Sequence, residues 1–221
     1  MLSPSRFRDV LVVLLTVTTG ATDATAFIAL GHAFASVITG NLVLLGISAA
    51  GADGHLAVTA GAALGAYALG VILAAPRRPR AADGTRPLWP ASTTVALGAD
   101  LALLVAFAVA WEIDGRAPGR GAQLVMMVLC AAAMGVQSTA IRRLGSISTT
   151  YLTSTFVDVL ESIVARRWRA DQTRSVLILF GLAGGAAAAA ALISHARSWL
   201  PIAQLLPLVT VAVASVRLIR A

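Results

Sequence analysis

Long runs without a charged residue constrain this chain more than any other feature. Residues 56–75, 175–194 and 200–216 contain no Asp, Glu, Lys or Arg. A helix that crosses the hydrocarbon core of a bilayer needs about 20 mostly apolar residues. Only 12% of the 221 residues are charged, against about 25% in an ordinary soluble domain. The sequence therefore predicts an all-α, polytopic membrane helix bundle.

Six of the apolar segments are long enough to cross the membrane, and two are short. The short segments, about 36–50 and 149–165, each follow a turn that contains a glycine, Gly31 or Gly145. We expect two broken or re-entrant helices there, because irregular backbone at membrane depth is tolerated only under a cover of protein or water. The eight segments are about 8–31, 36–50, 56–75, 92–111, 121–141, 149–165, 175–194 and 200–219.

A weak internal repeat divides the chain. The stretch from Asp23 to Leu45 recurs 114 positions later without gaps when Gly31 is placed on Gly145. The identical pairs include Thr25/Thr139, Leu30/Leu144, Thr39/Thr153 and Val43/Val157. We therefore predict a first membrane repeat over 1–112 and a second over 113–221, which together form one integral membrane domain.

The arginines predict the topology. All 17 basic residues are arginine, and most lie between the apolar segments, where the positive-inside rule places them on the cytoplasmic side. Keeping Arg6, Arg8 and the 77–86 loop inside requires that segment 36–50 does not fully cross. The same reasoning in the second half gives six crossings, two inverted pseudo-repeats and cytoplasmic termini. If both short segments span, the halves are parallel, but the 77–86 loop then lies outside.

Polar side chains within apolar segments are the candidates for a binding site, since hydrocarbon makes them costly. Thr22 and Asp23 end the first span, and Thr39 and Asn41 begin the short helix. Hydroxyl, amide and unpaired N–H groups at a helix start suit an anionic or polar group, and a desolvated carboxylate suits a cation or proton. With equal weight, Thr39 and Asn41 cap the short helix and bond to its neighbours.

The second copy supplies the remaining candidates for a substrate- or ion-binding site. They are Gln137, Ser138, Thr153 and Asp158. Gln137 takes the place of Asp23, so the two copies are not equivalent. Asp100 stands alone in the fourth span, where it either pairs with an arginine or lines a cavity.

The sequence contains no pattern typical of an enzyme. The three histidines lack metal-ligand spacing, and Cys130, the single cysteine, allows no internal disulfide. Neither a P-loop nor a nucleophile elbow is present. We expect no enzyme activity, cofactor, metal ion or nucleic-acid partner.

Several motifs resemble the DUF1275 family of bacterial membrane proteins, also called the YoaK family. Those of the first half are Gly20-x-x-Asp23-Ala24, Leu30-Gly31-x-x-Phe34 and Thr39-Gly40-Asn41. Those of the second half are Met134-Gly135-x-Gln137-Ser138 and Thr149-Thr150-x-x-Thr153. The family usually continues Thr-Gly where this chain has Thr153-Ser154. The resemblance covers essentially the whole chain and implies about six spans in a bacterial plasma membrane, without a settled activity.

A small-molecule transporter is the leading functional hypothesis, with the two motif segments forming a site at the repeat interface near the midplane. A channel or pore and a non-transporting structural or regulatory subunit stay open as alternatives. The expected partners are the lipid bilayer and a small molecule or ion. A second copy of the chain is a further candidate, because two glycines four residues apart allow close helix contact. Such faces occur at Gly61/Gly65 and Gly181/Gly185.

Overall fold

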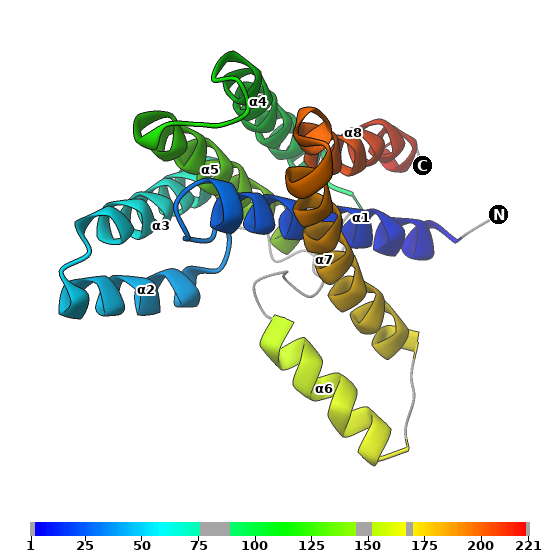
Figure 1. Cartoon of the computed structure of the whole chain (residues 1–221). Coiled ribbons are helices and arrows are strands. Elements are labelled where there is room, and N and C mark those ends of the chain that lie inside the picture. The colour runs from blue at the N-terminus through cyan, green and yellow to red at the C-terminus, as the bar shows by residue number, and fades with distance from the viewer. Residues whose placement is uncertain (1–2, 76–88, 145–151, 167–169, 220–221) are drawn as a thin grey trace.

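The computed structural model describes residues 3–75, 89–144, 152–166 and 170–219, and its regular elements are helical (Figure 1). Six helices are long and apolar enough to cross a membrane, counting the turn η2 with α8. The predicted all-α membrane bundle is therefore confirmed, while the 77–86 loop lies outside the described residues. The elements are α1 (Pro4–Ala29), α2 (Ile38–Gly51), α3 (Gly54–Ala74), α4 (Ala91–Ile113), α5 (Arg120–Arg143), α6 (Leu152–Val164), α7 (Ala170–His195), η2 (Arg197–Trp199) and α8 (Leu200–Ile219).

Four helices enclose the core of the bundle, and we call them the four-helix ring. Helix α1 packs against α5 and α8, and α4 packs against the same two helices, so the contacts close a circle. Each member carries a stripe of buried residues at spacings of three and four, the pattern of a helix with one face in a core. The stripes include Leu15, Thr18 and Thr22 in α1, Leu97, Asp100 and Leu104 in α4, Cys130, Met134 and Gln137 in α5, and Gln204, Leu208 and Val211 in α8.

The remaining helices form an outer layer around the four-helix ring. Helix α7 packs against α1, and α3 packs against α5 (Figure 1). The short helices lie further out, α2 beside α3 and α6 beside α7. The second half thus repeats most of the packing of the first with the partners exchanged, since α1–α7 corresponds to α5–α3, α1–α8 to α5–α4 and α2–α3 to α6–α7, whereas the α7–α8 contact has no comparable α3–α4 counterpart. The junction between the predicted repeats falls at the end of α4.

Glycines allow the backbones of α1 and α7 to touch where these helices cross. A Cβ atom on Gly20 would overlap the carbonyl oxygen of Leu182, and one on Gly185 would overlap the carbonyl oxygen of Val17. Such small-residue crossings let membrane helices gain van der Waals contact, since apolar association has little driving force in lipid. Only glycine fits these two positions without moving a helix.

The crossing of α5 and α3 has the same construction. Gly135 faces the carbonyl oxygen of Tyr67, and Gly70 faces that of Ala132, again too closely for a Cβ atom. Each glycine of this pair stands 115 positions from a glycine of the α1–α7 pair. The structural repeat of the crossings is therefore one residue longer than the 114-residue register of the loop motif.

The two glycine ladders have different surroundings. Gly181 and Gly185 pack against α1 within the same chain, so this face is occupied and not available to a second copy. Gly61 and Gly65 have at most one distant neighbour, the side chain of Leu45 at 4.0 Å from a Cβ built on Gly61. The predicted homo-oligomer face is therefore open only at Gly61/Gly65.

Polar contacts define the two ends of the bundle. At one end Arg174, near the start of α7, binds Asp9 of α1 with 3.1 Å between Nη1 and Oδ1. Arg143, which ends α5, donates to the carbonyl oxygens of Ala74 in α3 and Ser92 in α4. The first contact joins the starts of α1 and α7. The other two join the end of α5 to the end of α3 and the start of α4, and both groups of helix ends lie near one end of the bundle.

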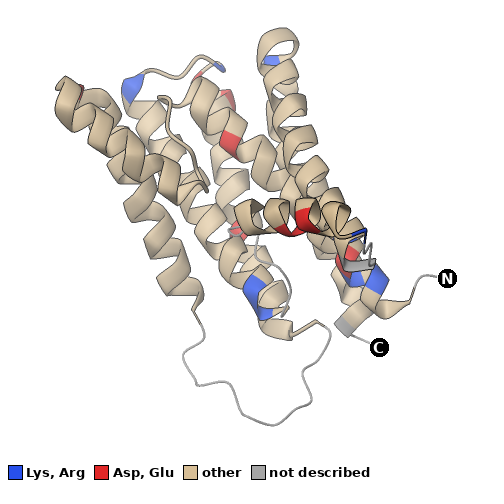
Figure 2. Ribbon diagram, turned by 90° about the horizontal axis from the view of Figure 1, so that it is seen from below, with Lys and Arg blue, Asp and Glu red and all other residues tan. Residues whose placement is uncertain are grey.

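A hydrogen bond between α4 and η2, the turn that precedes α8, holds the opposite end of the bundle. The indole Nε1 of Trp111, near the end of α4, donates to the carbonyl oxygen of Arg197 at 3.0 Å. Helices α1, α4 and α7 consequently run one way, and α3, α5 and α8 run the other. Figure 2 shows most of the charged ribbon segments near the ends of the long helices, as expected for a bundle with an apolar girdle.

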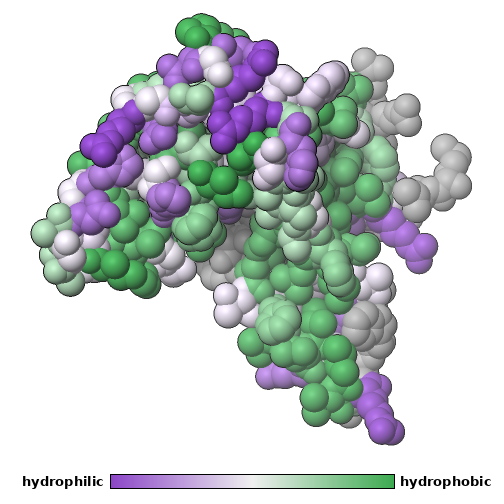
Figure 3. Space-filling view, viewed as in Figure 1, coloured by the Kyte–Doolittle hydropathy of each residue, from purple (hydrophilic) through white to green (hydrophobic). Residues whose placement is uncertain are grey.

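Apolar side chains cover much of the outside. Figure 3 shows a hydrophobic surface over α6 and the adjoining part of α7. Its exposed residues include Phe156, Leu160 and Ile163 of α6 and Phe180 of α7. In water such a surface is an aggregation hazard, whereas in a bilayer it is the lipid-facing side.

Replacing Gly185 by Ala should destabilise the protein, because the added methyl group meets the Val17 backbone rather than a movable side chain. Overpacking of this kind costs about 1–3 kcal/mol of unfolding free energy. Gly184→Ala is the matched control, since a Cβ there meets no atom within 4 Å. Thermal unfolding in detergent should show a lower midpoint for Gly185→Ala alone, and equal midpoints for the two variants would contradict the described crossing.

Candidate functional site

A row of hydroxyl groups runs along the buried side of α1. The buried polar residues are Thr16, Thr18, Thr19, Thr22, Asp23 and Thr25. The hydroxyls of Thr19, Thr22 and Thr25 donate to the carbonyl oxygen four residues earlier, at 3.0, 2.8 and 2.8 Å. Because each hydroxyl proton is used within the helix, the oxygen presents its lone pairs to neighbouring helices.

Two glutamine side chains use these lone pairs to connect α5 and α8 to α1. Gln137 of α5 donates from Nε2 to Thr19 Oγ1 at 2.9 Å and to the carbonyl oxygen of Leu15 at 3.0 Å. Gln204 of α8 donates from Nε2 to Thr25 Oγ1 at 3.1 Å. The side-chain oxygens of both glutamines are buried and accept no hydrogen bond from any described residue.

Asp100 is the least satisfied polar group of the four-helix ring. It lies near the middle of α4, is fully buried, and neither carboxyl oxygen accepts a hydrogen bond within the described part of the chain. Thr93 Oγ1, seven residues earlier on the same face, is buried without a partner among the described residues as well. The thiol of Cys130 on α5 is fully buried within the same four-helix ring.

The motif residues Asp23 and Asn41 hold the loop of residues 30–37. Asp23 Oδ1 accepts from the backbone N–H of Ser36 at 2.7 Å, and Asp23 Oδ2 accepts from Ser36 Oγ at 2.6 Å. Asn41 Oδ1 accepts from the N–H of Phe34 at 2.9 Å, while its Nδ2 donates to the carbonyl oxygen of Phe34 at 2.7 Å. The loop therefore folds back along α1 to the level of Asp23, and α2 starts from there.

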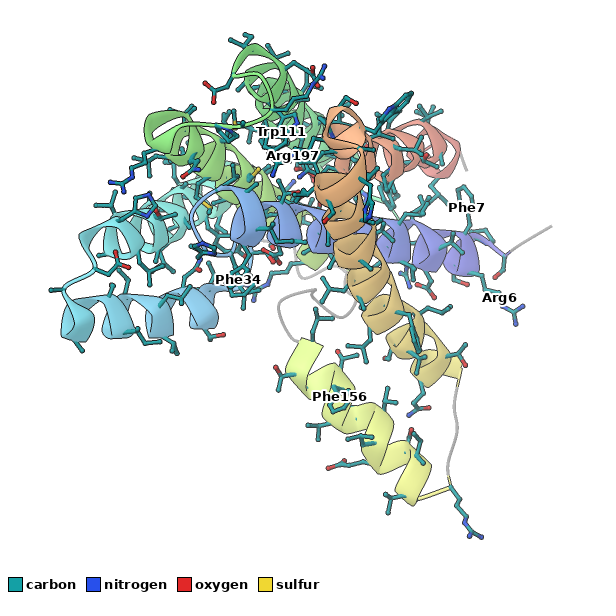
Figure 4. All side chains as sticks on the ribbon, in the orientation of Figure 1. Arg6, Phe7, Phe34, Trp111, Phe156 and Arg197 are labelled. Carbon is teal, nitrogen blue, oxygen red and sulfur yellow. The ribbon has the colours of Figure 1, made fainter. Side chains whose placement is uncertain are left out.

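The conformation of this loop explains further motif positions. Gly31 has φ +108° and His32 φ +62°, so the chain reverses through the left-handed region, where glycine is favoured. The ring of Phe34, labelled in Figure 4, stacks on Phe27 with 4.9 Å between the ring centroids. The N-cap of α2 is Val37, without a side-chain cap bond. The predicted capping of α2 by Thr39 or Asn41 is therefore wrong, and Asn41 bonds to Phe34 of the preceding loop rather than across to a neighbouring helix.

An apolar groove lies beside the 30–37 loop, at the crossing of α1 and α7. Its volume is about 480 Å³, and Asp23 is the charged member of a lining that includes Gly20, Phe27, Phe34 and Ala186. The described residues contain no group of three or more His, Cys, Asp or Glu side chains that could hold a metal ion. The polar chemistry of the fold is thus hydrogen bonding and electrostatics around Asp23 and inside the four-helix ring.

Comparison with known proteins agrees with this architecture. Residues 11–215 match the family model described as "Protein of unknown function (DUF1275)". The chain belongs to the DUF1275 family. It is 31% identical over 178 residues to the UPF0700 transmembrane protein YoaK of Bacillus subtilis (strain 168), which covers 80% of this chain and 76% of that protein. No solved structure matches the chain. Together with the six long apolar helices, this establishes a multi-pass integral membrane protein of the DUF1275 family.

The structure separates the predicted site residues of this DUF1275 protein into two groups. Thr22, Asp23, Asn41, Gln137 and Ser138 are buried. The other three are exposed on the short outer helices and are not brought to the four-helix ring: Thr39 on α2, Thr153 and Asp158 on α6. A binding role for these three stays a prediction. The motif positions Gly145, Thr149 and Thr150 lie outside the described residues.

The sequence did not identify Gln204 as a site residue, and for Asp100 it left open whether the side chain pairs with an arginine or lines a cavity. Both lie on buried stripes, at spacings of three and four from large apolar residues. A polar residue at such a position in an otherwise apolar run, as Gln204 is in 200–216, is the signal that would have found it.

Replacing Asn41 by Ala should loosen the 30–37 loop, because the variant leaves the N–H and the carbonyl oxygen of Phe34 without their partner. Buried unsatisfied groups of this kind cost about 1–3 kcal/mol. The unfolding midpoint should fall and the amide of Phe34 should exchange its hydrogen faster. Thr39→Ala, on the exposed side of the same helix turn, is the control and should change neither. An unaltered exchange rate at Phe34 in Asn41→Ala would show that the clamp does not hold the loop.

Proposed function

We propose that this DUF1275 protein is a transporter of small polar solutes whose binding site lies inside the four-helix ring. The observation that carries the proposal is the fully buried carboxyl group of Asp100, without a hydrogen-bond partner among the described residues. An ionisable side chain within a membrane helix is expensive, and such residues mark substrate or ion pathways. A purely structural core would place an apolar residue here, as at Leu97 and Leu104 on either side.

The directions of the helices support an inverted-repeat transporter. Helices α1, α3 and α4 alternate in direction, and their counterparts α5, α7 and α8 alternate from the opposite start. A half-turn about an axis in the membrane plane relates such halves, with α1 exchanged for α5 and α4 for α8. The four-helix ring takes two helices from each half, which corresponds to the repeat interface where transporters of this plan hold their substrate.

The arginines support cytoplasmic termini in the bacterial plasma membrane. Arg143 and Arg174 make the contacts that define one end of the bundle, where α1 with Arg6 and Arg8 begins, and the sequence between α3 and α4 contains four more arginines. Arg116, Arg120 and Arg197 belong to the opposite end. The positive-inside rule therefore assigns the arginine-rich end to the cytoplasm.

Large apolar side chains in the four-helix ring favour a gated transporter over an open channel. Leu104, Phe107 and Trp111 follow Asp100 toward one end of α4, and all three are fully buried. A solute reaches Asp100 only if the helices move apart on one side. The hydrogen bonds of Asp23 and Asn41, in contrast, are made within the protein itself. A non-transporting membrane subunit would also need such bonds, so that function is the second candidate.

Replacing Asp100 by Asn tests the proposal in proteoliposomes. We expect the purified wild-type protein to give solute-dependent uptake with at least one compound in a panel of small amines, amino acids, sugars and carboxylates. Asp100→Asn should reduce that uptake by at least about tenfold, since one side chain in a buried charged contact is worth about 1.4 kcal/mol or more. Its unfolding midpoint should be equal or higher, because the variant removes a buried group that is costly to ionise.

The control is Asp53→Asn, at the exposed N-cap of α3, where Asn is an equally good cap and uptake should persist. Absence of uptake with every solute class, or full uptake by Asp100→Asn, would refute the transporter function. A strongly lowered unfolding midpoint in Asp100→Asn would instead favour the structural-subunit candidate.

A further inference from the structure

We infer that the solute taken up by the four-helix ring is a small organic cation that carries several N–H donors, as an alkylamine or guanidinium compound does. This inference rests on the proposed transport function and specifies its substrate class. It is based on the buried oxygens of the four-helix ring that have no partner among the described residues, and on the acidic side chain among them.

The unpartnered buried atoms on the inward stripes are all oxygens. They are Thr93 Oγ1, Asp100 Oδ1, Asp100 Oδ2, Gln137 Oε1 and Gln204 Oε1, counted over the described residues. An amide oxygen can only accept hydrogen bonds, and the same holds for both oxygens of an ionised carboxylate. The donor groups of both glutamines are already used in bonds to α1. Apart from the Thr93 hydroxyl, the unpartnered groups of the interior therefore call for donors, which a ligand can bring.

The ionisable side chains of the same region are acidic. Asp100 lies on the inward stripe of α4, and Asp23 is a second buried carboxyl group on α1. The described arginines belong to the ends of the helices and the loops that join them. The Coulomb energy between unit charges rises as the dielectric constant falls, so a bound cation favours the ionised form of Asp100, whereas an anion opposes it.

The spread of the oxygens favours an extended cation over a single metal ion. Gln137 bonds to α1 at Leu15 and Thr19, whereas Gln204 bonds at Thr25, about two to three turns further along. A hard metal ion needs six or more oxygens gathered at about 2.1–2.6 Å. A proton alone would pair one oxygen of Asp100 and leave both glutamine oxygens without a donor. A molecule with several N–H groups reaches oxygens at separate levels.

Thermal unfolding of the purified protein in detergent tests this class directly with three probes at equal ionic strength. Methylguanidinium chloride supplies charge and donors, tetramethylammonium chloride supplies charge alone, and potassium acetate supplies an anion of similar size. We expect a concentration-dependent rise of the unfolding midpoint with methylguanidinium, a smaller rise with tetramethylammonium and none with acetate. Binding of methylguanidinium should weaken at least about tenfold in Asp100→Asn, and Asp100→Glu should retain the preference for cations.

Each other outcome is informative. A midpoint raised by acetate, or an order of the three probes unchanged in Asp100→Asn, overturns the cation inference. In proteoliposomes, uptake of only anionic or neutral solutes by the wild type overturns it too, yet leaves the transport function standing. Uptake of none of the panel overturns the transport function itself.

Discussion

Hydrocarbon offers no hydrogen bonds, and this constraint governs where every polar side chain of the bundle lies. The threonines of α1 meet it by donating to their own helix, and their oxygens then receive the amides of Gln137 and Gln204. The same bonds connect α1 to α5 and α8, so polar pairing and helix assembly are one interaction. Against this background Asp100 stands out, because neither of its carboxyl oxygens has a hydrogen-bond partner among the described residues.

Close backbone contact supplies the second part of the construction. The glycine crossings attach α7 to α1 and α3 to α5, which leaves the inward faces of α1 and α5 free to build the four-helix ring with α4 and α8. The short helices stay attached to the outer layer. Of the motif residues on these helices, Asn41 of α2 acts through the 30–37 loop, which it holds against α1 together with Asp23, and this loop borders the groove at the α1–α7 crossing.

Local patterns in the sequence predicted the elements, and long-range packing decided the site. Uncharged runs such as 56–75 predicted the spans, and the short segment after Gly31 predicted α2, because both depend on neighbouring residues alone. The exchange of partners between the halves, with α7 on α1 and α3 on α5, had no local signature. Asp23, predicted as a cation or proton site, accepts hydrogen bonds from Ser36, and its predicted role stays a prediction. Gln204 escaped notice because its partners Thr18 and Thr25 lie far away in the chain.

The central claim is that the closed interior of the four-helix ring opens to water, and Cys130 reports on it directly. This single cysteine is fully buried on the inward stripe of α5. Its reaction with a membrane-impermeant thiol reagent can be measured by mass spectrometry in right-side-out and inside-out vesicles, with Cys130→Ala as the blank. The account predicts modification from both sides of the native membrane, slowed by a bound solute. A thiol that reacts only after the protein is denatured would contradict it.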